Sequence, residues 1–135
     1  IARSAVFERK VELKSSAEQY RDFIPLTSVC SAIEFFIDIH SEKLLDGLFN
    51  LGGNNSMRIK EMVLIFMQRC EHVLKYKPIL TMPLSTSSYD CDYLIYSIDK
   101  IKKIGFEVDS YLNSELDKLI LFCCEMYKGS TNEIL

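Results

Sequence analysis

The residue types that most often do chemistry are few and scattered in this sequence. The two histidines, His40 and His72, are 32 residues apart, and neither has a carboxylate or a thiol at a spacing typical of metal ligands. The adjacent Cys123 and Cys124 would point about 100° apart on a helix, which argues against a redox pair. We therefore expect no metal site and no acid–base role for either histidine.

A pair of glycines precedes two amides in the segment Gly52-Gly53-Asn54-Asn55. A phosphate-binding loop would also need a lysine and a preceding strand, so we interpret the segment as a helix end, a turn and the cap of the next helix. The sequence contains no G-x-S-x-G, no phosphate-cradling glycine loop and no H-E-x-x-H. These absences predict that the protein is not an enzyme and has no cofactor.

Tyrosines and lysines recur at spacings of four, three, four and three residues on a predicted helix over 88–104. A surface helix normally carries Glu, Lys or Gln at such positions, whereas tyrosine beside a cation is typical of a binding surface. The alternative is that the N-terminal helix or the 77–87 segment covers the tyrosines. The candidate partner-binding residues are Tyr89, Tyr93, Tyr96, Lys100 and Lys103.

Helices must position these residues, because apolar side chains recur with helical periodicity and no segment shows sustained alternation. The clearest segment begins at Asn55 or Ser56, either of which would be the N-cap. The four strongest predicted helices cover 27–40, 55–76, 88–104 and 110–128, with a shorter one at 42–50 and a less regular one at 4–23.

The length of 135 residues suits one domain. We predict an all-α fold: a single domain over 1–135 of about five to six helices in antiparallel hairpins, forming a helical bundle or a short, helical-repeat-like α-solenoid. The segment 77–87 contains two prolines and is the expected long loop. Because the chain starts with Ile1 and ends in a polar trailing segment, we expect it to be excised from a larger protein.

Charge and cysteine content indicate the surroundings of the protein. The 16 basic and 19 acidic residues give a net charge of −3, which disfavours nucleic acid as a partner. Five cysteines at irregular spacing predict free thiols and a reducing compartment, either the cytoplasm or the nucleus. The longest uninterrupted apolar runs have six residues, as from Met62 to Met67, and are too short to cross a membrane.

Together these patterns favour a non-catalytic protein–protein interaction domain, a scaffold that docks a protein or peptide segment. An alternative is a helical-repeat RNA-binding module, in which the tyrosines stack on bases and Lys100, Lys102 and Lys103 contact phosphates. A third hypothesis, a helical regulator of host signalling of the viral kind, rests on analogy of fold alone.

Overall fold

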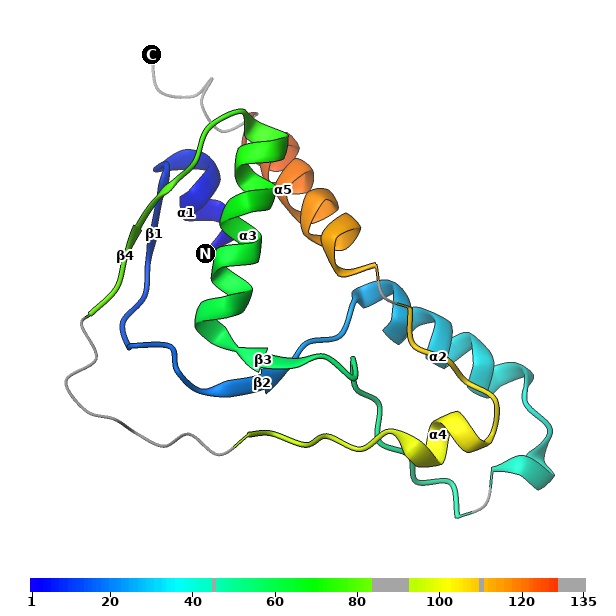
Figure 1. Cartoon of the computed structure of the whole chain (residues 1–135). Coiled ribbons are helices and arrows are strands. Elements are labelled where there is room, and N and C mark those ends of the chain that lie inside the picture. The colour runs from blue at the N-terminus through cyan, green and yellow to red at the C-terminus, as the bar shows by residue number, and fades with distance from the viewer. Residues whose placement is uncertain (45, 84–92, 110, 129–135) are drawn as a thin grey trace. The chain divides into compact units, whose positions relative to one another are not determined.

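The computed structural model describes residues 1–44, 46–83, 93–109 and 111–128 (Figure 1). The chain divides into two compact units that alternate along the sequence. Unit 1 is formed by Ile1–Gln19, Arg58–Asp90 and Asn113–Leu135, and unit 2 by Tyr20–Met57 and Cys91–Leu112.

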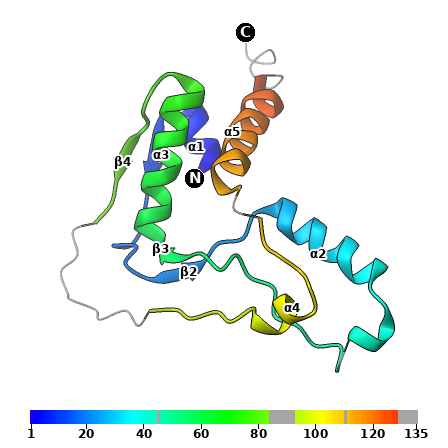
Figure 2. The same cartoon turned by 45° about the vertical axis from the view of Figure 1, so that its right-hand side comes forward.

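Unit 1 combines helices with a pair of parallel strands, which lie side by side in Figures 1 and 2. The strands are β1 (Lys10–Glu12) and β4 (Ile79–Thr81). The helices are α1 (Ala2–Phe7), α3 (Ile59–Leu74) and α5 (Leu112–Lys128). Because parallel strands and helices form this unit together, the fold is α/β, and the prediction of an all-α bundle or α-solenoid is wrong.

The core of unit 1 follows from the pattern of apolar residues along α3. The side chains that recur at helical spacing on α3 turn toward β1 and α5, and Val11 of β1 lies opposite Leu80 of β4. Burial of this apolar surface is the main source of stability for such a small unit. The buried members of the cluster are Ala5, Val11, Leu13, Ala17, Val63, Phe66, Met67, Cys70 and Ile120.

Unit 2 contains the paired strands β2 (Tyr20–Asp22) and β3 (Ser56–Arg58), the long helix α2 (Leu26–Asp38), a 3₁₀ turn (Ser41–Lys43) and the short helix α4 (Asp99–Lys103). Aromatic rings from α2 and from the following loops pack around a small buried centre. The buried residues of this second core are Ala32, Ile98, Ile101 and Phe106.

The predicted helices over 27–40, 55–76 and 110–128 are confirmed with shifted ends. α3 starts at Ile59, and its N-cap is Arg58 instead of the predicted Asn55 or Ser56, because residues 56–58 form β3. On α2 the buried positions are Ser28 and Ala32. Helical periodicity places Ile33 and Ile37 on the same apolar face as Ala32, yet they are 57% and 75% exposed.

The other predicted helices are largely wrong. The segment 4–23 contains α1, β1 and β2. Among the residues that the structure describes, the segment 42–50 contains only the end of the 3₁₀ turn, and the helix over 88–104 is reduced to α4. The predicted loop 77–87 contains strand β4 between its two prolines, and residues 84–87 lie outside the described part of the chain. Proline is tolerated there because it flanks a short strand without occupying its ladder positions. The prediction of one domain over 1–135 stays a prediction.

None of the helices in the described ranges is long and apolar enough to cross a membrane.

Candidate functional site

A carboxylate of β2 holds the glycine turn of unit 2 in place. Asp22 accepts two backbone hydrogen bonds, from the N–H of Gly53 at 2.5 Å and from the N–H of Asn55 at 2.9 Å. The backbone N–H of Phe23 donates to the carbonyl oxygen of Asn55 at 3.3 Å. The turn is thus fixed to the chain segment that leads from β2 into α2.

The two glycines are required because the backbone approaches its neighbours too closely for a side chain. A Cβ atom at Gly52 would lie 2.4 Å from Cδ1 of Tyr96, and a Cβ atom at Gly53 would lie 1.7 Å from the carbonyl oxygen of Phe23. Asn54, which follows, has a positive φ of 50°, a conformation that Asn tolerates better than most residues. The turn is therefore determined by close packing and by hydrogen bonds, and not only by the flexibility of glycine.

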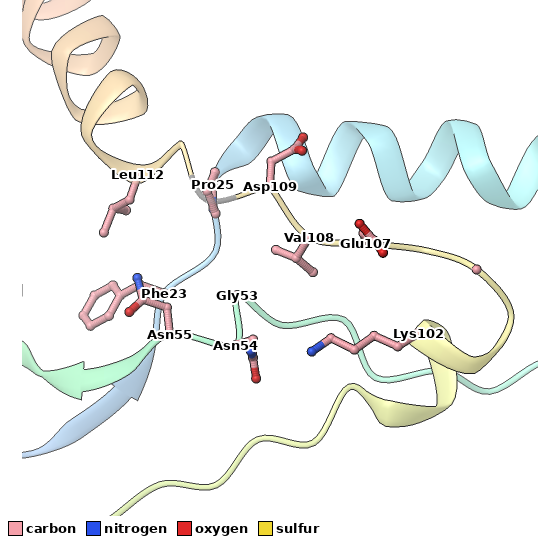
Figure 3. Close-up of a pocket in the computed structure, with 11 residues that line it drawn as sticks. Phe23, Pro25, Gly53, Asn54, Asn55, Lys102, Glu107, Val108, Asp109 and Leu112 are labelled. Atoms are coloured by element: carbon pink, nitrogen blue, oxygen red, sulfur yellow. The ribbon is translucent and has the colours of Figure 1, made fainter.

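A cavity of about 640 Å³ opens beside this turn, a volume within the usual range for small-molecule sites. Three segments of unit 2 line it: the connection from β2 to α2, the glycine turn, and the chain from α4 to the start of α5 (Figure 3). Figure 3 shows the Lys102 side chain reaching toward Asn54, with Phe23 and Asn55 on the opposite side. Its lining residues are Phe23, Pro25, Gly53, Asn54, Asn55, Lys102, Gly105, Glu107, Val108, Asp109 and Leu112.

A smaller cavity of about 190 Å³ also borders the turn and shares Asn54 with the larger one. Tyr93 and Tyr96 both line it, together with Asp22 of β2. The Tyr93 ring packs edge-on against Tyr20, with the ring centroids 5.0 Å apart. The glycine turn therefore borders two cavities in one unit.

The structure separates the five residues of the predicted tyrosine–lysine face. Tyr89 lies outside the described residues, and Tyr93 and Tyr96 belong to a non-helical segment, so the helical spacing that grouped them is absent there. Lys100 is bound to the 46–49 loop: it pairs with Asp46, donates to the carbonyl oxygen of Leu48 at 2.5 Å and lies 4.9 Å from the ring centroid of Phe49. Its hydrogen bond lowers the pKa of the Asp46 carboxyl group.

Lys103 is exposed on α4. The partner-binding role of these residues, and the expected protein or peptide partner, stay predictions. Both histidines, His40 and His72, have exposed side chains. Within the described ranges, no group of three His, Cys, Asp or Glu side chains is placed to hold a metal ion.

Sequence reasoning missed the residues that make the larger cavity, apart from the glycine turn itself. The signal that would have completed the site is Asp22, which lies 31 and 33 positions before the two amides it binds. Sequence reasoning named Lys102 as a phosphate contact for RNA and did not link it to the glycine turn, with which it lines this cavity.

Comparison with solved structures gives this arrangement a context. Over 93% of its length the chain superposes on a UDP-N-acetylglucosamine 4-epimerase from Methanobrevibacter ruminantium in complex with UDP-N-acetylmuramic acid, with a TM-score of 0.66 and 20% sequence identity. A dTDP-glucose 4,6-dehydratase from Bacillus anthracis in complex with NAD matches 94% of the chain, with a TM-score of 0.63 and 20% identity. A UDP-glucose 4-epimerase from Thermotoga maritima with UDP-glucose matches 93%, with a TM-score of 0.62 and 15% identity.

The chain spans only 38% of the length of each of these three enzymes. At such low sequence identity the likeness establishes the fold and nothing finer. No protein-family model matches the sequence, and no curated protein sequence matches it.

These comparisons correct the functional predictions made from the sequence. The chain shares its α/β fold with parts of epimerases and dehydratases, not with helical-repeat scaffolds. The predictions of a non-catalytic interaction domain, of an RNA-binding helical repeat and of a protein that is not an enzyme are therefore wrong.

Proposed function

We propose that this chain is the sugar-nucleotide-binding portion of an enzyme that modifies the sugar of a nucleoside diphosphate sugar. The observation that carries the proposal is the fold likeness over 93% of the chain to enzymes whose structures hold UDP-N-acetylmuramic acid or UDP-glucose. The 640 Å³ cavity beside the glycine turn is the proposed site.

The chemistry of the cavity suits such a ligand. Lys102 supplies a positive charge for a diphosphate, and the side-chain amides of Asn54 and Asn55 supply hydrogen-bond donors and acceptors. Phe23 supplies an aromatic surface, while Glu107 and Asp109 supply acceptors for sugar hydroxyl groups.

The glycine turn and the start of α3 do not fit the dinucleotide present in the dehydratase complex. A dinucleotide site places a glycine-rich turn between a strand and a helix N-terminus, whereas here the glycine turn leads into strand β3. The start of α3 is also occupied: Ile59 and Lys60 donate their N–H groups to the carbonyl oxygens of Gln19 and Ala17, and the Glu61 carboxylate accepts from the N–H of Arg58. We accordingly propose a substrate-binding role and assign no dinucleotide contact to these residues.

Titration of the 135-residue chain with UDP-glucose, UDP-N-acetylglucosamine and dTDP-glucose, followed by NMR, tests the proposal. We expect binding of at least one of them, with the perturbed signals in segments 23–25, 53–55 and 102–112. Lys102→Gln should weaken the affinity about 5- to 10-fold, because one charge-assisted phosphate contact is lost. Lys103→Gln, the same change on the next residue of α4, should leave the affinity unchanged.

No binding of any of the three at millimolar concentration would overturn the proposal. Binding that perturbs only signals outside the three segments would refute this cavity as the site.

We also propose that the protein works in a reducing compartment, the cytoplasm or the nucleus. The four described cysteines, Cys30, Cys70, Cys123 and Cys124, are free thiols, which supports this location. Fluorescence microscopy of a tagged protein tests it, and a signal confined to the secretory pathway would contradict it.

A further inference from the structure

The larger cavity of unit 2 has two chemically different sides. On one side Phe23 and Asn55 lie next to each other, joined by the backbone hydrogen bond between their segments. Pro25 and Leu112 add apolar surface to the lining. On the other side Lys102 extends from α4 toward Asn54 (Figure 3). The aromatic ring and the Asn55 amide thus lie at one end of the lining, and the cation lies at the other.

Two backbone amides of the glycine turn are already engaged and cannot bind an anion. The N–H groups of Gly53 and Asn55 already donate to the Asp22 carboxylate at 2.5 and 2.9 Å. A phosphate in this cavity would therefore depend on the Lys102 ammonium group and on the side-chain amide of Asn54. This restricts where the negative charge of a ligand can be placed.

The Glu107 and Asp109 carboxylates restrict the ligand further. Both line the cavity from the chain that follows α4, the helix that carries Lys102. They repel a phosphate near them and favour groups that donate hydrogen bonds. Hydroxyl groups of a sugar attached beyond the phosphates meet that requirement.

We propose that this cavity binds the nucleotide half of the sugar nucleotide in one orientation, with the base against Phe23 and Asn55 and the phosphates at Lys102. The inference rests on the proposed function and adds to it which part of the ligand each side of the cavity binds. Aromatic side chains hold bases by stacking on their faces. The Asn55 amide has both a donor and an acceptor for the edge of a pyrimidine.

Calorimetric titration of the 135-residue chain with four probes tests the orientation: UDP, UDP-glucose, glucose 1-phosphate and pyrophosphate. We expect UDP to bind within about 3-fold of UDP-glucose, because the nucleotide supplies most of the contacts, and glucose 1-phosphate to bind at least 10-fold more weakly. Lys102→Gln should lower the affinities for UDP and for pyrophosphate by similar factors. Lys103→Gln is the matched control and should change neither affinity.

Two substitutions on the opposite side separate base recognition from phosphate recognition. Phe23→Leu should lower the affinity for UDP about 10-fold and leave the affinity for pyrophosphate unchanged. Because Phe23 is half-buried and its loss also affects packing, Asn55→Ala provides a second test. This change removes only the side-chain amide and keeps the backbone hydrogen bonds to Asp22 and Phe23. It should reduce the difference in affinity between UDP and CDP, whose bases differ at the edge that the amide would contact.

The outcomes distinguish this inference from the function on which it rests. If UDP-glucose binds but UDP does not compete with it, or if neither Phe23→Leu nor Asn55→Ala changes UDP binding, the orientation is wrong and the sugar-nucleotide proposal stands. If the chain binds no sugar nucleotide, both fall.

Discussion

Among the glycines of the described part of unit 2, Gly53 has the least room for a side chain, so its replacement should be costly. In Gly53→Ala the new methyl group would meet the carbonyl oxygen of Phe23, whose backbone cannot move aside without breaking its hydrogen bond to Asn55. We expect a loss of about 1–3 kcal/mol in the free energy of unfolding, measured by urea denaturation.

Gly47→Ala is the control for this change. Gly47 has a positive φ of 73°, and a methyl group added there would meet no atom within 4 Å. Only the strain of a left-handed conformation, about 1 kcal/mol, should therefore appear. A smaller loss for Gly53→Ala than for Gly47→Ala would show that the turn can move.

Single residues also show why the site was only partly predictable. The glycine pair signals a turn in any sequence, and that prediction needs no partner. The Asp22 carboxylate has no local signal, because the amides it binds come from a segment more than thirty residues later. Tyr93 and Tyr96 were grouped by helical spacing, which lost its meaning once that segment proved to be non-helical.

At the scale of elements, an ion pair between Arg69 and Asp117 joins α3 and α5. The guanidinium donates two hydrogen bonds to the carboxylate, at 2.7 and 2.5 Å, and Arg69 holds the pKa of Asp117 below its ordinary value of 3.8. A lowered pKa in the folded state adds stability above the unfolded pKa, and this stability is lost as the pH falls through the folded pKa.

Asp117→Asn should therefore lower the free energy of unfolding by about 0.5–1 kcal/mol at neutral pH, as is usual for a partly exposed ion pair. The difference from the parent should shrink toward pH 2, as the Asp117 carboxyl group becomes protonated and loses its charge. Urea denaturation at the two pH values checks this. Glu125→Gln, which removes an exposed carboxylate of the same helix, should show no difference at either pH. A gap that persists in acid would mean that packing, not charge, explains the loss.

The two cores differ in how much stability a single aromatic ring contributes. Phe66 is 4% exposed in the core of unit 1, so Phe66→Ala should cost about 3–5 kcal/mol. Phe36 is only half-buried, with its ring centroid 5.1 Å from that of Phe49, so Phe36→Ala should cost clearly less. Urea denaturation of each variant measures the loss in the free energy of unfolding. Equal losses would contradict the observation that Phe36 on α2 is less buried than Phe66.

Strands were the elements that sequence patterns could not find. Alternation is recognisable over four to eight residues, whereas β1, β2, β3 and β4 each have three. Their pairing is decided by segments distant in the sequence. Long helices such as α3 and α5 carry enough turns for their period to be read directly, although the period alone did not reveal which face of α2 is covered.

For the whole molecule, the cysteines report on global unfolding. Cys30 is exposed, whereas Cys70 is fully buried, and burial raises the pKa of the Cys70 thiol to about 11. With iodoacetamide at pH 8 we expect Cys30 to react at the rate of a free thiol and Cys70 to react only as the chain unfolds. Mass spectrometry of each peptide over time measures the two rates. Rapid labelling of Cys70 in the folded protein would show that unit 1 opens locally.

The parallel pair β1–β4 has a consequence for how the chain is made. Lys10 pairs with Ile79, 69 positions later in the sequence. A ribosome adds about 5–20 residues per second, so β1 is synthesised roughly 3–14 seconds before its partner strand. Throughout that interval the backbone groups of β1 have no native strand to bind. Slower codons between the two strands would lengthen this exposure in proportion, and faster ones would shorten it.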